Sequence, residues 1–371
     1  TNLAPWKDYH DNIKTVTISE GITSLGEFTF YSFGNYSYDN LTSVSLPSTL
    51  KSIGSHAFYM CKSLESIVIP DGVTKIEANT FYGCTALKTV TLPKNLTSIG
   101  NLAFAGSGIL SVVIPDSVNT IVQFAFFDCR SLENVTLGSG LTSIEADAFN
   151  GCSALTEVVF NCTKLGSIGK NVFKNCTSLS ELSGDASSIT AISPSAFENC
   201  TALKGSSLAI FTGLTTIGDS AFAGCTSLDE IIFPESLTSI GTDAFKGCTA
   251  LSAVTLPEYL ATIGNYAFYN TAITSIVIPK SASSIGDAAF ASGKLESITV
   301  AAENTNFIVS GNCLIDKTNK ILIAAGSNPK IPFDWSVTKI GKYAFYGSNA
   351  TEIAIPGSIT EINYNAFDSC V

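Results

Sequence analysis

Residues 64–86 read LESIVIPDGVTKIEANTFYGCTA, and residues 251–272 read LSAVTLPEYLATIGNYAFYNTA. Both follow the template L-x-x-V-x-L-P-x-x-L-x-x-I-G-x-x-A-F-x-x-C, although they lie far apart in the chain. Self-similarity at a fixed period indicates a repeat architecture, in which each unit buries its apolar face against the next unit. About fourteen copies of about 23 residues cover nearly all of the 371 residues, so the sequence predicts a single solenoid domain, 1–371. The units begin at Ile13, Leu41, Leu64, Leu87, Ile109, Leu132, Leu155, Leu179, Leu203, Leu228, Leu251, Ile273, Leu295 and Ala350.

The template also predicts the local structure of each unit. Its first part, as in Ile67-Val68-Ile69, alternates β-branched side chains, which is typical of a strand with one buried face. The proline that follows in many units ends this strand, because it has no N–H to continue a ladder. A second short extended piece comes next, and the glycine after it, such as Gly54, permits a turn that a side chain would hinder. The closing A-F-x-x-C segment predicts a short helical turn.

The apolar template positions define the expected core. One unit alone cannot cover these side chains, but stacked units cover each of them with its equivalent in the next coil. In the unit that starts at Leu64 we expect the buried residues to be Leu64, Ile67, Ile69, Val73, Ile76 and Phe81.

Composition excludes several classes of protein. Hydrophobic residues make up 45% of the chain and charged residues only 14%, the opposite of the balance in disordered chains. No apolar run is long enough to span a membrane, and the amino-terminal residues do not resemble a signal peptide. The net charge of −11 argues against nucleic-acid binding, which relies on Lys and Arg to neutralise phosphates.

The Ile-Gly-x-x-Ala-Phe core of the template, as in Ile240-Gly241 and Ala244-Phe245, resembles the BspA-like leucine-rich repeat of microbial surface proteins. The resemblance runs from about Ile13 to Val371. It implies a right-handed curved stack, with a parallel sheet on the concave side and short strands or helical turns on the convex side. It also implies a secreted or cell-surface protein that adheres to host proteins or other cells. The family supplies no catalytic residues to carry over.

Three regions depart from the template. Residues 1–40 carry extra residues and suggest an amino-terminal capping repeat, because terminal repeats are usually atypical. The units at Leu155, Leu179 and Leu203 lack the proline and run slightly long, which favours a bend or bulge in the sheet. Residues 301–336 interrupt the pattern with short apolar runs separated by Ser-Gly-Asn and Lys-Thr-Asn, so we expect a hairpin-like or three-stranded insertion there.

Nine of the eleven cysteines fall at one repeat position. A zinc site needs four converging ligands, and cysteines stacked one strand spacing apart lie beyond the usual disulfide range. Other units place Ser107, Thr271 or Gly293 at this position, which indicates a slot for a small buried residue that satisfies backbone groups. We therefore predict free thiols, with no metal and no cofactor. The nine are Cys61, Cys84, Cys129, Cys152, Cys176, Cys200, Cys225, Cys248 and Cys370.

No catalytic motif appears with the context that its chemistry requires. The two histidines, His10 and His56, do not recur, and no pair of carboxylates stands out for glycoside hydrolysis. We therefore predict a protein that is not an enzyme. A structural spacer that presents another domain, or a carbohydrate-active solenoid enzyme, remains an alternative.

Two columns of residues are expected on the exposed face of the strand sheet. One is rich in carboxylates, and the other consists of Thr, Val, Ser and Ile. Such a face needs β-formers and charge for solubility, and it also suits a mildly acidic surface that steers a basic partner. The candidate binding residues are Glu65, Val68, Glu133, Thr136, Glu157, Val159, Asp229, Glu230, Ile232 and Thr255.

A second set of candidates is the aromatic residue directly after Ala-Phe. These rings offer contact anchors or stacking platforms for sugars, or they pack over the convex turns. The set consists of Tyr59, Tyr82, Phe127, Tyr269 and Tyr346. The sequence as a whole predicts a binding module for a protein or glycan on host or neighbouring cells, present as a monomer or weak dimer.

Overall fold

The computed structural model describes residues 12–32 and 38–370 of the chain. These residues form a parallel β-solenoid with almost no helix, so the predicted repeat fold is confirmed. The chain divides into two compact units, Thr1–Ile189 and Thr190–Val371, which are described in turn. Residues 1–11 and 33–37 of the predicted capping repeat, 1–40, lie outside the described residues. A single solenoid domain stays a prediction.

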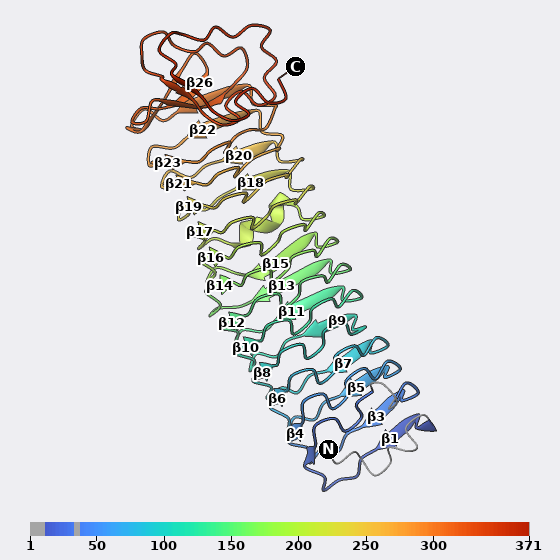
Figure 1. Ribbon diagram of the computed structural model, residues 1–371. Helices are drawn as coiled ribbons and strands as arrows, with labels where there is room; N and C mark the ends of the chain where they lie inside the picture. The colour runs from blue at the N-terminus through green and yellow to red at the C-terminus, as the bar shows by residue number, and fades with distance from the viewer. Residues whose placement is uncertain (1–11, 33–37, 371) are drawn as a thin grey trace. The chain divides into compact units, whose positions relative to one another are not determined.

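In unit 1 each coil contributes a longer strand and a two-residue strand, and equivalent strands pair in parallel (Figure 1). The pairing is in register with the repeat: Val135 lies opposite Val158, and Thr136 lies opposite Val159. The longer strands are β1 (Thr15–Thr17), β3 (Ser43–Ser45), β5 (Ser66–Val68), β7 (Thr89–Thr91), β9 (Ser111–Val113), β11 (Asn134–Leu137), β13 (Glu157–Asn161) and β15 (Glu181–Asp185). The short strands are β2 (Ser24–Leu25), β4 (Ser52–Ile53), β6 (Lys75–Ile76), β8 (Ser98–Ile99), β10 (Thr120–Ile121), β12 (Ser143–Ile144) and β14 (Ser167–Ile168).

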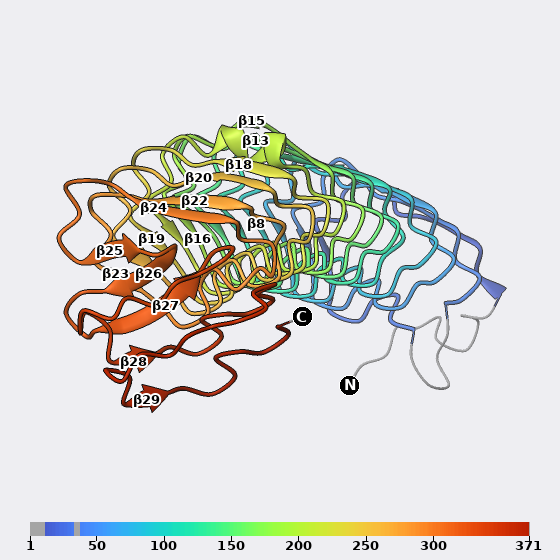
Figure 2. The same ribbon diagram turned by 90° about the horizontal axis from the view of Figure 1, so that it is seen from above.

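Unit 2 repeats this arrangement, and its longer and short strands follow different sides of the coils (Figure 2). The longer strands are β18 (Glu230–Ile232), β20 (Ala253–Thr255), β22 (Ser275–Ile278) and β24 (Ser297–Val300). The short strands are β16 (Ala191–Ile192), β17 (Thr216–Ile217), β19 (Ser239–Ile240), β21 (Thr262–Ile263) and β23 (Ser284–Ile285).

Three antiparallel strands follow β24. They are β25 (Phe307–Ser310), β26 (Cys313–Asp316) and β27 (Ile321–Ala325), and β27 then pairs in parallel with β28 (Lys339–Ile340). The last strand, β29 (Glu361–Ile362), pairs with β28. Strand β27 thus takes the place beside β28 that a regular coil would occupy.

The apolar template positions form the core. Phe81 is fully buried, and its ring stacks on Phe58 at 5.2 Å between centroids and on Phe104 at 5.1 Å. The same stacking runs from Phe197 through Phe222 to Phe245 in unit 2. The six residues predicted to be buried in the unit at Leu64 are all no more than 2% exposed, so the predicted core is confirmed: Leu64, Ile67, Ile69, Val73, Ile76 and Phe81.

The prediction of a helical turn at A-F-x-x-C is wrong. Successive N–H groups instead donate alternately within the coil and to the next coil. The Ala57 N–H donates to the Gly54 carbonyl of the same coil at 3.3 Å, and the Phe58 N–H donates to the Thr80 carbonyl of the next coil at 2.9 Å. The residues two before and two after the phenylalanine hold positive φ angles, as His56 and Met60 do at +59°. Hydrogen bonds to the next coil replace some of the bonds that a helix would make within a coil. The acceptors of these bonds are present only when coils are stacked.

Glycines serve two different purposes in these coils. Gly247, two residues after its phenylalanine, has a φ of +74°, a conformation that costs other residues free energy. Gly264, which follows the template isoleucine, has no positive φ, but a Cβ on it would lie 2.4 Å from the Thr242 nitrogen. Close approach of the coils therefore excludes a side chain at Gly264, whereas Gly247 suits a left-handed turn that Met60 also adopts in its own coil.

We expect Gly264→Ala to destabilise the protein more than Gly247→Ala. The first methyl group collides with backbone of the preceding coil, and overpacking of this kind costs about 1–3 kcal/mol or more. The second meets no atom closer than 3.9 Å and only incurs the left-handed penalty of about 1–2 kcal/mol. Urea denaturation followed by circular dichroism measures both. Equal losses would show that steric contact between coils is not what selects Gly264.

The coils that lack the proline differ from one another. In place of a bend or bulge, β13 and β15 lengthen to five residues each. The coil that begins at Leu203 has no strand at that position and forms the 3-10 helix η2 (Gly205–Ile210) instead. A Cβ on Gly205 would lie 1.8 Å from the Glu230 oxygen, so this glycine allows η2 to pack directly on β18.

Candidate binding surface

The longer strands of unit 1 place two of the predicted columns in continuous rows. Across β9, β11, β13 and β15 one row consists of Val113, Thr136, Val159 and Ser183, which pair in register. Neighbouring parallel strands lie about 4.8 Å apart, so side chains in such a row contact one another. Val113 is 67% exposed, whereas Thr136 and Val159 are half-buried.

The parallel row on the same strands is polar and acidic. Asn134 lies opposite Glu157, and Glu157 lies opposite Glu181. The Ser183 hydroxyl donates to the Glu157 carboxylate at 3.0 Å, which fixes one acidic group beside the apolar row. Glu133, just before β11, is exposed. Unit 1 therefore presents a β-branched row flanked by carboxylates.

Unit 2 repeats the pattern on β18 and β20, where Ile232 lies opposite Thr255. Ile232 is 78% exposed, although burial of an isoleucine side chain would stabilise the folded protein. Glu230 on the same strand is also exposed. The exposed isoleucine and the carboxylate are thus two residues apart on one face of the strand.

Asp229 has a structural role. Its carboxylate accepts hydrogen bonds from the Gly205 N–H at 3.2 Å and the Glu230 N–H at 3.1 Å, and these bonds lower its pKa. It therefore ties η2 to β18. The sequence signal for this role is Gly205 in the preceding unit. The column of acidic residues does not by itself distinguish Asp229 from its neighbours.

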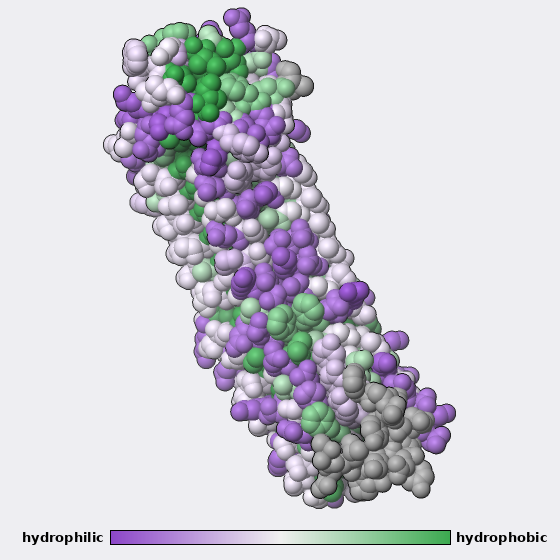
Figure 3. Space-filling model, viewed as in Figure 1, coloured by the Kyte–Doolittle hydropathy of each residue, from purple (hydrophilic) through white to green (hydrophobic). Residues whose placement is uncertain are grey.

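The remaining carboxylates of the two columns are available to a partner. Among the described residues, no ion-pair partner is present for Glu65, Glu133, Glu157 or Glu230. Glu65 is exposed beside Val68, which is 65% exposed. One face of the molecule shows hydrophilic residues interspersed with apolar areas, the broadest of them near the C-terminal end of the chain (Figure 3).

The cysteine column is structural, as predicted. All eleven thiols are free, and all except Cys370 are buried. Thiols of the column donate to the phenylalanine carbonyl of the preceding coil, as from Cys84 Sγ to Phe58 at 3.1 Å and from Cys248 Sγ to Phe222 at 3.2 Å. Ser107 and Thr271 occupy the same slot and are buried, which confirms the predicted small-residue position.

Burial of these thiols predicts a loss of stability at alkaline pH. It raises the pKa of Cys84 and of Cys248 to about 12, so both stay protonated while the same thiols in the unfolded chain ionise near pH 9. The free energy of unfolding is therefore full below about pH 9 and falls as the pH rises toward 12, by about 1.4 kcal/mol per pH unit for each thiol.

The double variant Cys84→Ala, Cys248→Ala isolates this effect. Its unfolding free energy, measured in urea from pH 7 to pH 11, should fall less steeply above pH 9 than that of the unmodified protein. Cys370→Ala is the control, because Cys370 is exposed. Parallel curves for the double variant and the unmodified protein would contradict the assignment.

The aromatic residues after Ala-Phe are half-buried and stack along the turns. The Tyr59 ring lies 5.2 Å from Tyr31 and 4.9 Å from Tyr82. Phe127 packs against Phe124 within its own coil. Of the alternatives given by the sequence, packing over the turns therefore describes Tyr59, Tyr82 and Phe127. Tyr269 and Tyr346 also meet, at 5.1 Å, beside a pocket considered below.

The described residues hold no cluster of His, Cys, Asp and Glu that would suit a metal ion. Within the same residues, no helix has the length and apolarity of a membrane span. The coils, their leucine-led strands and the stacked phenylalanines define a leucine-rich-repeat solenoid.

Comparison with known families narrows this class. The model of the BspA type leucine-rich repeat region matches residues 8–129, 99–209, 204–319 and 325–371. The chain therefore belongs to the BspA-type leucine-rich-repeat family.

Solved structures agree with the fold. A leucine-rich-repeat protein from Bacteroides ovatus is 25% identical, over 96% of this chain and 85% of that one, with a TM-score of 0.57. The pneumococcal vaccine antigen PcpA is 19% identical, over 96% of this chain and 88% of that one, with a TM-score of 0.50. No curated protein matches the sequence.

Proposed function

We propose that this chain is a non-catalytic binding module of a secreted or cell-surface protein, and that it recognises a protein partner through the exposed face of its longer strands. The observation that carries this proposal is the β-branched column on these strands, in which Val68, Val113 and Ile232 are exposed, beside carboxylates that have no ion-pair partner in the described residues. Membership of the BspA-type family supports the extracellular location.

The two rows supply different parts of recognition. Exposed β-branched side chains such as Val113 and Ile232 provide apolar area that a partner can cover. Unpaired carboxylates such as Glu133 attract a basic surface and raise the association rate, an effect that salt screens. The partner that fits is a protein with a basic patch around an apolar centre.

A charge-reversal variant tests this proposal. Immobilised extracellular-matrix proteins, among them fibronectin, fibrinogen, laminin and collagen, are the probes, and surface plasmon resonance is the readout. Glu133→Lys should lower the association rate at low salt several-fold, and the difference should shrink in high salt. Glu77→Lys is the matched control: Glu77 is exposed beside the short strand β6. Binding to none of these proteins, or equal rates for the two variants, would refute the proposal.

A further inference from the structure

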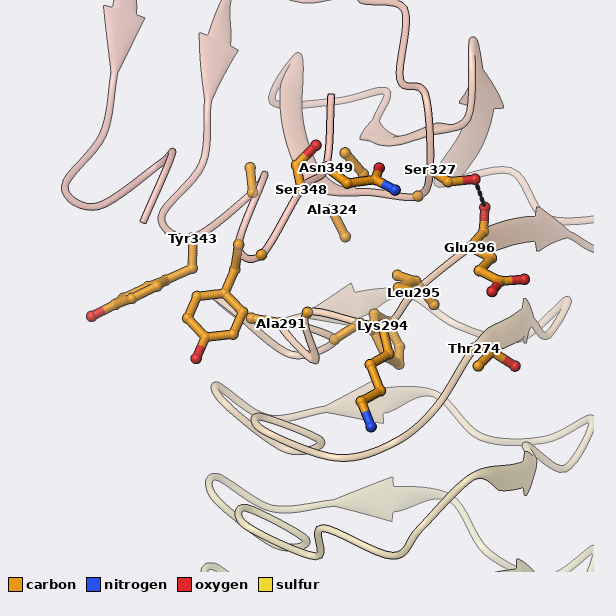
Figure 4. A pocket seen from close by; sticks show the side chains of 17 residues that line it. Thr274, Ala291, Lys294, Leu295, Glu296, Ala324, Ser327, Tyr343, Ser348 and Asn349 are labelled. Atoms are coloured by element: carbon orange, nitrogen blue, oxygen red, sulfur yellow. Dashed lines mark hydrogen bonds between the residues drawn. The ribbon is translucent and has the colours of Figure 1, made fainter. Parts of the chain in front are cut away.

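The antiparallel insertion opens a pocket in unit 2. Strand β27 pairs with β28, so β28 does not pair with β23, the short strand of the preceding regular coil. On the turn side the two regular coils still meet, because a Cβ on Gly347 would lie 2.4 Å from the Gly293 Cα. A cavity of about 270 Å³ lies between these regions (Figure 4). Its existence follows from the wedge that the insertion creates.

Small apolar residues keep this pocket open. Ala291, Ala324 and Ala344 line it and are almost completely buried, as is the Phe290 ring. Ala291 stands directly after Ala-Phe, the position that holds a tyrosine, Tyr269, in the preceding coil. A tyrosine in place of Ala291 would occupy the space that the alanine leaves empty.

Two tyrosines form one side of the pocket. Tyr343 and Tyr346 line it, and their rings lie 5.9 Å apart between centroids with an interplanar angle of 60°. The Tyr343 hydroxyl accepts a hydrogen bond from Asn365 Nδ2 at 2.9 Å. The Tyr346 ring packs against Tyr269 at 5.1 Å between centroids, and the nearby Tyr346 hydroxyl, together with burial, raises the pKa of Tyr269. These contacts hold both rings in place without a ligand, which lowers the entropic cost of binding.

Polar side chains surround the opening. Lys294, Glu296 and Asn349 line the pocket and are exposed, and Figure 4 shows them on different sides of it. Among the described residues, none of these three side chains has a hydrogen-bond or ion-pair partner. The pocket therefore combines an apolar floor, an aromatic side and a rim that offers donors and acceptors of both charges.

We propose that this pocket binds the terminal pyranose ring of a glycan. A pyranose has an apolar C–H face, which fits a tyrosine ring, and hydroxyl groups around its edge, which fit Asn349, Glu296 and Lys294. The cavity is smaller than the range of about 300–1,000 Å³ that drug-sized ligands occupy, which suits one sugar ring. This site is independent of the protein-binding proposal for the strand face, because neither needs the other.

Two other hollows lack this combination. The pocket beside Asp287 and Lys342 is lined by polar and aliphatic groups without an aromatic ring, and the Lys342 ammonium is already paired with Asp287 at 2.8 Å. The hollow beside Gly54 has no aromatic lining residue either. Phosphate is also a poor occupant of the tyrosine pocket, since its single lysine is offset by a carboxylate.

Saturation-transfer NMR on the full chain tests the proposal. The probes are the methyl glycosides of glucose, galactose, mannose and N-acetylglucosamine. At least one should bind saturably with a Kd in the millimolar range, and Tyr346→Ala should weaken that binding about tenfold or more. Tyr82→Ala is the matched control, since Tyr82 holds the same repeat position in unit 1, away from the pocket. Asn349→Ala, on the exposed rim, should weaken binding several-fold.

Each outcome decides the question. Failure of all four glycosides to bind would overturn the proposal, and so would unchanged binding in both Tyr346→Ala and Asn349→Ala. If Tyr346→Ala does not fold, as judged by its melting curve, the exposed rim variants Asn349→Ala and Lys294→Ala decide alone. Loss of protein binding by Glu133→Lys with unchanged glycoside binding would separate the two proposals.

Discussion

Replacement of Phe245 by alanine is expected to lower the free energy of unfolding by about 3–5 kcal/mol, the cost of truncating a fully buried phenylalanine. The Phe245 ring lies between Phe222 and Phe268, each at 5.3 Å between centroids, and is 0% exposed. The neighbouring coils are held by their own hydrogen bonds, so they cannot close fully over the space that the ring leaves. Urea unfolding followed by circular dichroism measures the loss.

The same variant reports how the coils depend on each other. Repeat stability is a sum of contributions from each unit and from its interfaces with its neighbours. Amide hydrogen exchange should therefore speed up most in the coils that carry Phe222, Phe245 and Phe268, and less in the coils farther along unit 2. Tyr259→Ala serves as the control, because Tyr259 is 57% exposed. A loss below about 1 kcal/mol for Phe245→Ala would contradict the stacked core.

The second large effect is expected from a charge on the buried face of one strand. Ile231 is 3% exposed, and its neighbour Ile232 is 78% exposed. Ile231→Lys should cost several kcal/mol, enough to prevent unit 2 from folding, because a buried ammonium without a partner is strongly unfavourable. Ile232→Lys should change stability by no more than about 0.5 kcal/mol. Melting temperature and soluble yield compare the two variants directly.

A milder pair keeps this prediction testable if Ile231→Lys cannot be purified. Ile231→Ala should cost about 2–5 kcal/mol and Ile232→Ala much less, since only the first opens a cavity. Similar melting temperatures for the two alanine variants would mean that the two faces of β18 are not buried and exposed as described. The pair also separates stability from binding, because Ile232 belongs to the proposed binding face.

Most of the fold could be predicted from features that repeat along the sequence. A leucine that leads a strand, an isoleucine before a turn and a phenylalanine after a small residue recur at the same template positions in most units, so their burial follows from stacking alone. The residues expected in the core around Leu64 and Phe81 are buried, and the cysteine slot holds free thiols. The exposed placement of Val68, Ile232 and Glu230 also followed from strand alternation. That these residues bind a partner stays a prediction.

The features that sequence reasoning missed depend on contacts between coils. The A-F-x-x-C segment is not helical, because every second N–H donates to the next coil, and the sequence of one unit does not contain that partner. Gly264 is required by the distance to Thr242, not by its own φ angle. Asp229 ties η2 to β18, a contact that depends on the replacement of a strand by a 3-10 helix in the preceding coil.

The amino-acid sequence by itself determined that this protein is a leucine-rich-repeat solenoid, because a regular apolar period leaves no other way to bury its side chains. The sequence also located the interruption of the repeat at residues 301–336, but only the tertiary structure decided how the coils on either side of it meet. The pairing of β27 with β28 and the contact of Gly347 with Gly293 join residues far apart in the chain, and they leave a cavity beside Tyr343 and Tyr346. The sequence repeat predicts contacts between equivalent residues of neighbouring coils, whereas the pocket lies where β28 pairs with β27 and not with an equivalent short strand.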